Sequence, residues 1–164
     1  MQIASFKDMY IAELQELVSM ESQLADALQR STEIASHPSL KSLFNRHRLE
    51  TMQQGDQVRT ILQKHGADGQ THTDQSIQAL IAETEKMANI LQNDDLRDAG
   101  LIASAQKLEH YEIAAYGSAA ALAGQLDLRD DQRQLHTILE QERRADKLLT
   151  DLAKAEINHD AAAA

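Results

Sequence analysis

Hydrophobic residues recur at steps of three and four along most of the chain, the spacing that gives an α-helix one apolar face. This pattern is interrupted at Pro38, in the polar stretch 65–73, in the turn 93–95 and again over 124–131. Between these breaks the periodicity predicts five helices, near residues 4–36, 39–65, 75–92, 96–123 and 130–157. On the first of them the apolar face is expected to begin at Ile3 and Phe6.

The lengths of the connections predict how the helices are joined. Short links at Pro38 and at 124–131 make two antiparallel helical hairpins, over residues 4–65 and 96–157. Residues 66–95 form a long crossover that carries the short amphipathic helix. We therefore expect an all-α, ferritin-like four-helix bundle with an extra short helix in its crossover. It should form one domain over residues 1–157, followed by a frayed tail over 158–164.

Acidic residues interrupt the apolar seams that such a bundle buries. Each of the four long helices has one on its predicted seam, namely Glu21, Glu50, Glu112 and Glu142. Measured from the turn inside each hairpin, their positions differ by at most three residues, which corresponds to about 4.5 Å along a helix. The same tracing places further polar groups on or beside the seams: His47, Gln54, Glu109 and Asp146. The pattern thus predicts four inward carboxylates at one level of the bundle.

Four carboxylates at one level of a dry core require compensation. Two of them about 4 Å apart repel each other by about 4 kcal/mol at an effective dielectric constant near 20. The seams offer no lysine or arginine, so protonation or bound cations must balance the charge. A dinuclear centre is the arrangement known for carboxylate-bearing bundles, and oxygen-rich ligands favour iron or manganese over zinc or copper. The alternatives are a seam glutamate that is merely hydrogen-bonded and a core role for His47.

Composition narrows the classes of function. The 164 residues include one proline, six glycines and no cysteine, which disfavours all-β folds and excludes disulfides, iron–sulfur clusters and cysteine nucleophiles. The net charge of −10 disfavours nucleic acid and anionic membranes as partners and favours cations. The sequence shows no apolar run of about 18 residues and no basic, apolar leader at its start. We therefore expect a cytoplasmic protein.

Five segments carry a resemblance to a known family. They are Glu21-Ser22-Gln23-Leu24, His47-x-x-Glu50-Thr51-x-x-Gln54, residues 97–103, residues 106–117 around Glu109-His110-Tyr111-Glu112, and Glu142-x-x-x-Asp146. Over residues 5–153 the chain resembles the YciE/YciF ferritin-like family, and its YciF branch more closely. The resemblance implies a ferritin- or rubrerythrin-like bundle, homodimers, and a link to bacterial stress. It also implies an inward acid set of Glu21, Glu50, Glu112 and Glu142, flanked by His47, Gln54, Glu109 and Asp146.

Two functions from different classes remain open at this point. The first is a dinuclear iron or manganese protein that handles ferrous iron or peroxide, with Glu50 and Glu142 bridging and Glu21 and Glu112 terminal. The chain lacks the Glu-x-x-His pair of di-iron enzymes, so turnover and catalytic residues stay unassigned. The second is a non-catalytic helical module with a vestigial site, acting through its surface or its dimer. A DNA-coating mini-ferritin is disfavoured because the chain has no basic tail.

Overall fold

The computed structural model describes residues 3–69 and 72–164 of the chain, and the polar stretch 65–73 and the start of the predicted domain fall partly outside them. The described residues form α1 (Phe6–Ile34), α2 (Pro38–Lys64), α3 (Gln75–Ile90), α4 (Asp94–Gln125), α5 (Arg129–Leu152), a π-helical turn (Ala153–Ile157) and α6 (Asn158–Ala163). No strand occurs among these described residues. All five predicted helices are present, with boundaries displaced by a few residues.

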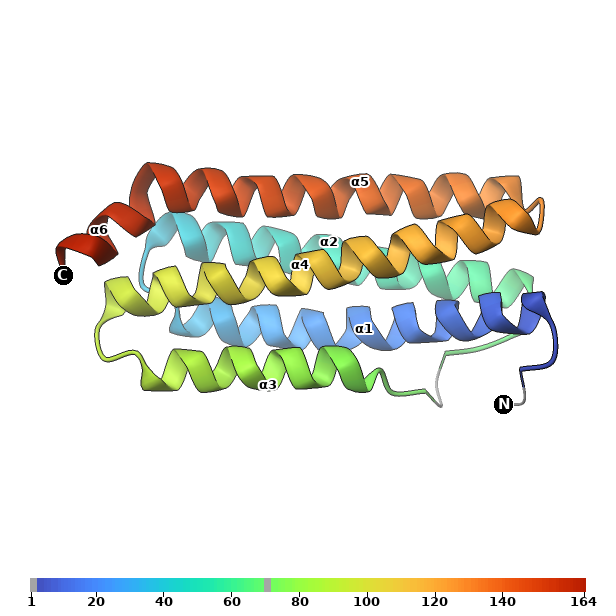
Figure 1. Cartoon of the computed structure of the whole chain (residues 1–164), viewed down its shortest axis with the longest axis horizontal. Helices are drawn as coiled ribbons and strands as arrows, with labels where there is room; N and C mark the ends of the chain where they lie inside the picture. The colour runs from blue at the N-terminus through green and yellow to red at the C-terminus, as the bar shows by residue number, and fades with distance from the viewer. Residues whose placement is uncertain (1–2, 70–71) are drawn as a thin grey trace.

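The helices are connected as the sequence predicts. Helices α1 and α2 form one antiparallel hairpin and α4 and α5 the other, while α3 lies on the outside against α1 and α4 (Figure 1). The fold is the expected ferritin-like bundle with a helix in its crossover. Over residues 158–164, where the sequence predicts a frayed tail, the structure has α6, which contributes no buried residue. No helix of the described chain combines the length and apolarity that crossing a bilayer requires.

Local interactions fix the turn between α1 and α2. Pro38 occupies the first turn of α2, and the ring Nδ1 of His37 accepts a hydrogen bond from the Ser39 N–H at 3.3 Å. Buried Asp98 of α4 accepts hydrogen bonds from the N–H groups of Ser36 and His37, at 2.8 and 2.7 Å. One carboxylate thus ties the turn of the first hairpin to the first helix of the second.

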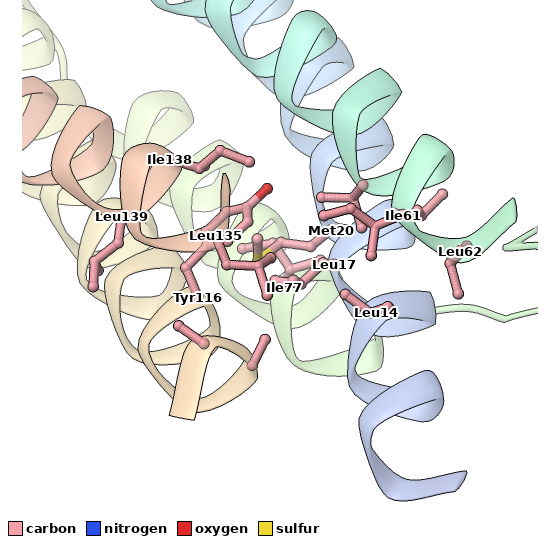
Figure 2. Packing of buried hydrophobic residues seen from close by; sticks show 14 of the residues in the cluster. Leu14, Leu17, Met20, Ile61, Leu62, Ile77, Tyr116, Leu135, Ile138 and Leu139 are labelled. Carbon is pink, nitrogen blue, oxygen red and sulfur yellow. The ribbon is translucent and has the colours of Figure 1, made fainter. Parts of the chain in front are cut away.

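Two apolar clusters fill the interior, one toward each end of the bundle. Figure 2 shows part of the larger cluster, in which Leu14 and Leu17 of α1 lie near Ile61 of α2. The smaller cluster includes Phe44 and Leu149. The predicted apolar face of α1 begins later than expected: Ile3 and Phe6 are exposed, and burial starts at Tyr10. A layer of buried polar side chains separates the two clusters.

Candidate metal centre

Four buried side chains from three helices meet in the polar layer. They are His47 of α2, Glu109 and Glu112 of α4, and Glu142 of α5. One potential ligand atom from each lies within 4.8 Å of the other three. Glu109 and Glu112 are three residues apart and therefore share one face of α4. The antiparallel neighbours α2 and α5 bring His47 and Glu142 to the same level.

His47 is held between two of these acids. Its Nε2 lies 2.9 Å from Oε1 of Glu109 and 3.8 Å from Oε2 of Glu142. Burial alone lowers the pKa of the imidazole, but the charge and hydrogen bond of Glu109, with the charges of Glu142 and Glu21, outweigh burial and raise the pKa to about 9. Without metal, His47 is therefore a cation at neutral pH that is paired with Glu109.

The other two acids of the group favour their neutral forms. Burial raises the pKa of Glu142 to about 9, although the nearby His47 opposes this shift. Burial and the charges of Glu142 and Glu109 hold the pKa of Glu112 well above its usual range. The side-chain amide of Gln54 donates a hydrogen bond to Oε1 of Glu142. The metal-free site therefore retains protons at neutral pH that a metal ion must displace.

The hydrogen bonding of the group is incomplete. The atoms without partners show whether the group could hold a metal ion. Both oxygens of Glu112 are buried without a hydrogen-bond partner, and so are one oxygen each of Glu109 and Glu142 and the Nδ1 of His47. Buried polar atoms are rarely left in this state. Ligand atoms about 2.0–2.6 Å from one ion are at most about 5 Å apart, which matches the spacing of the group. The residues therefore fit a divalent cation.

Glu21 of α1 adjoins the group from the remaining long helix. It is fully buried, and its Oε1 accepts a hydrogen bond from the hydroxyl of Tyr116. Burial raises the pKa of Glu21 to about 8, while the Tyr116 hydrogen bond and the charge of His47 lower it. Tyr116 was not among the predicted site residues. Its position four residues after Glu112, on the same face of α4, was the available signal.

The structure places the other two predicted ligands at the edge of the layer. Glu50 is half-buried and stands outside the group of four, although its charge contributes to raising the pKa of Glu142. Asp146 is also half-buried, and its Oδ1 accepts a hydrogen bond from the side-chain amide of Gln106 at 2.9 Å. Glu109, a predicted metal residue beside the four seam acids, is one of the group of four.

Comparison with known proteins places the chain in a family. Residues 5–162 match a family model that is described as a domain of unknown function, DUF892. The chain belongs to the DUF892 family. It is 34% identical over 159 residues to Protein YciF of Escherichia coli (strain K12), an alignment that covers 96% of both chains. The resemblance seen in the sequence is thereby confirmed.

Solved structures of similar chains share this architecture. The crystal structure of the E. coli stress protein YciF has a TM-score of 0.90, covering 95% of this chain and 99% of that one at 34% identity. YcfI from Rhodopseudomonas palustris, described as a candidate structural protein, has a TM-score of 0.87 at 30% identity, covering 91% and 95%. A Xanthomonas campestris protein at 20% identity, with a TM-score of 0.75 and coverages of 93% and 92%, shows the fold alone. The bundle described for this DUF892 chain is thus also found in its relatives.

Proposed function

We propose that this DUF892 protein binds a pair of iron or manganese ions in its buried polar layer. One observation carries the proposal: Glu112 is completely buried and neither of its carboxylate oxygens has a hydrogen-bond partner. Such a group costs free energy in the absence of a ligand, because its desolvation is not compensated. A cation that both oxygens coordinate removes that cost.

The proposal assigns a role to each acid near the layer. His47, Glu109, Glu112 and Glu142 hold one ion, since their ligand atoms already converge. Glu21 and Glu50 would supply the additional oxygens for a second ion. Asp146 supports the site from its edge, where Gln106 holds it.

The donor set also indicates the kind of metal. Five carboxylates and one imidazole present mostly hard oxygen atoms, which suit manganese and iron better than copper. Iron or manganese in such a site supplies electron exchange with dioxygen or peroxide. Around it, the residues of this chain would exclude bulk water, and the protons that Glu21, Glu142 and His47 hold without metal would leave as the ions bind.

Metal analysis of the full-length protein tests the proposal. We expect protein purified without chelator to contain up to two iron or manganese ions per chain. Glu112→Gln should lose most of this metal, and so should Glu142→Ala. Glu140→Gln is the matched control, because Glu140 is an exposed residue on α5 that pairs with Arg143. Metal contents equal to wild type in both Glu112→Gln and Glu142→Ala would overturn the assignment.

The description of YcfI as a candidate structural protein favours one alternative function, a non-catalytic helical module with a vestigial site. The two functions differ in their response to added metal. A ligand of the native state raises the melting temperature by mass action, so Fe(II) or Mn(II) should stabilise the protein only in the first case. We expect such stabilisation.

Three further features belong to the same proposal. Since YciF is described as a stress protein, we propose a stress-related role for this chain too. A homodimer in the cytoplasm, with neither nucleic acid nor membrane bound, is our expectation for its state. Analytical ultracentrifugation would test the dimer directly.

A further inference from the structure

A solvent-facing pocket between α1 and α2 ends at the buried polar layer. A pocket of about 360 Å³ elsewhere on the molecule is lined by no residue of the layer, whereas a pocket of about 230 Å³ between these two helices has Glu21 in its wall. We propose that this second pocket is the passage by which small, neutral, hydrogen-bonding molecules, such as water and hydrogen peroxide, reach the carboxylate centre. That the passage leads to a metal centre rests on the proposed function. That small molecules enter the pocket does not.

The inner part of the pocket is formed by buried polar groups that lack partners. Glu21 and Thr51 both line it and are 1% and 0% exposed. The Oε2 of Glu21 and the Oγ1 of Thr51 have no hydrogen-bond partner, and neither has the Nε of Arg48, a third lining residue. Together they offer both donors and acceptors. Groups of this kind bind molecules that both donate and accept hydrogen bonds, as a buried water does.

The inner end of the pocket is also part of the wall of the metal centre. Glu21 turns its other oxygen toward the hydroxyl of Tyr116, on the far side of the layer. Thr51 follows His47 by one helical turn on α2, so the two side chains lie on one face of that helix. Glu21 and Thr51 therefore lie where the pocket adjoins the centre.

The absence of a side chain at Gly55 keeps the helices close and the pocket open. A Cβ atom at this position would lie 3.2 Å from the Cβ of Glu21, which is tighter than ordinary packing. Gly55 lines the pocket beside Thr51, so any side chain there would press on the wall that Glu21 forms. Glycine in the middle of a helix is unfavourable by roughly 0.5–1 kcal/mol relative to alanine, so its presence here needs such a reason.

The charges at the mouth favour neutral molecules. Asp26 and Asp56 line the pocket together with Arg48 and Arg59. Arg59 donates to Asp56 at 2.7 Å, which leaves no excess of either sign among these four groups. An opening that concentrates cations or anions needs one dominant sign of charge. The passage is therefore matched to uncharged solutes.

Thiol labelling can test the passage without any metal. The chain contains no cysteine, so an introduced one is its only thiol. We would compare Thr51→Cys with Ala119→Cys in the folded full-length protein. Both positions are 0% exposed, but Ala119 lines neither of the two pockets. Methyl methanethiosulfonate, a small neutral reagent, should label position 51 at least about tenfold faster, because a sealed site reacts only through opening fluctuations. Equal rates would overturn the proposal.

Blocking variants test the route itself. Ser22 is an exposed residue that lines the pocket, so Ser22→Phe covers the mouth without entering the core. Combined with Thr51→Cys, it should reduce labelling toward the rate of Ala119→Cys, and Gly55→Ala should act in the same direction. The control is Ser118→Phe, at an exposed position on α4. Labelling of Thr51→Cys that is unaffected by Ser22→Phe would overturn this route.

Charged reagents and metal analysis separate the remaining possibilities. The neutral reagent should label position 51 faster than its cationic aminoethyl and anionic sulfonatoethyl analogues do. Each labelling rate is first divided by the rate of the same reagent with a free thiol. A faster cationic reagent would overturn the assignment to neutral solutes. Rapid labelling of Thr51→Cys, together with wild-type protein that binds no iron or manganese, would refute the proposed function and leave the passage supported.

Discussion

Replacing Glu142 by glutamine should stabilise the metal-free protein, although Glu142 is in the core. The side chain is fully buried, and its pKa is raised from an ordinary value of 4.5 to about 9. At pH 7 the folded protein must therefore keep this carboxyl protonated, whereas the unfolded chain leaves it ionised. Glutamine has nearly the same shape, and its carbonyl oxygen can still accept the hydrogen bond from Gln54.

The size of the effect follows from the two pKa values. One pH unit corresponds to about 1.36 kcal/mol, so protonating Glu142 at pH 7 costs about 3 kcal/mol of folding free energy. Glu142→Gln removes this cost but must bury an amide N–H₂ group, which lowers the expected gain to about 1–3 kcal/mol. At pH 5 the same cost is below about 1 kcal/mol, so the gain should nearly vanish.

Urea unfolding of chelator-treated protein at pH 5 and pH 7 measures the effect. Glu140→Gln provides the control, because this exposed residue should change stability by less than about 0.5 kcal/mol at either pH. With Fe(II) or Mn(II) present the order should reverse, since the variant has lost a ligand. A variant less stable than wild type at pH 7 without metal, or an equal gain at both pH values, would refute the reasoning.

Three further outcomes are expected. Without metal, stability should fall as pH rises from about 5 to 9 in urea titrations, because the pKa values of Glu21, Glu142 and His47 are raised on folding and the folded state binds more protons; a rise would contradict this. Mn(II) binding should release protons and tighten between pH 6 and 8, which calorimetry in buffers of different ionisation enthalpy detects; no proton release would count against the site. Asp98→Ala should cost about 2–3 kcal/mol in chemical denaturation, since it removes the acceptor of two backbone hydrogen bonds, and a loss below 1 kcal/mol would show that the turn holds without it.

The fold was predictable because its determinants are local. Breaks such as Pro38 separate helices whose apolar faces have the right period, and connection length then distinguishes the crossover from the hairpins. The misplaced start of the α1 core face has a local cause too. Ser5 caps the helix, and its hydroxyl and the carboxylate of Asp8 form a capping box, so Ile3 precedes the helix altogether.

The sequence predicts the level along the bundle at which the polar side chains lie. It does not predict which residues of each helix face inward at that level. Steps of three and four from His47 reach either Glu50 or Thr51 before Gln54, and the structure buries Thr51. A choice of one residue rotates a side chain by about 100°. Glu109 differs for another reason: it lies on the adjoining face of α4 and is buried because its carboxylate meets His47 of α2, at 2.9 Å. Both outcomes depend on how neighbouring helices pack, which periodicity within one helix does not encode.

The stability cost of the polar layer bears on the choice between a metal protein and a helical module. Glu142 alone costs about 3 kcal/mol at pH 7 without metal, a large share of the roughly 5–15 kcal/mol that stabilises an ordinary domain. A module that acted only through its surface would gain stability from apolar side chains in place of Glu112 and Glu142. Unfavourable buried groups are expected where function requires them. Here the buried acids gather at one level, between two apolar clusters. That concentration favours a core shaped for a ligand.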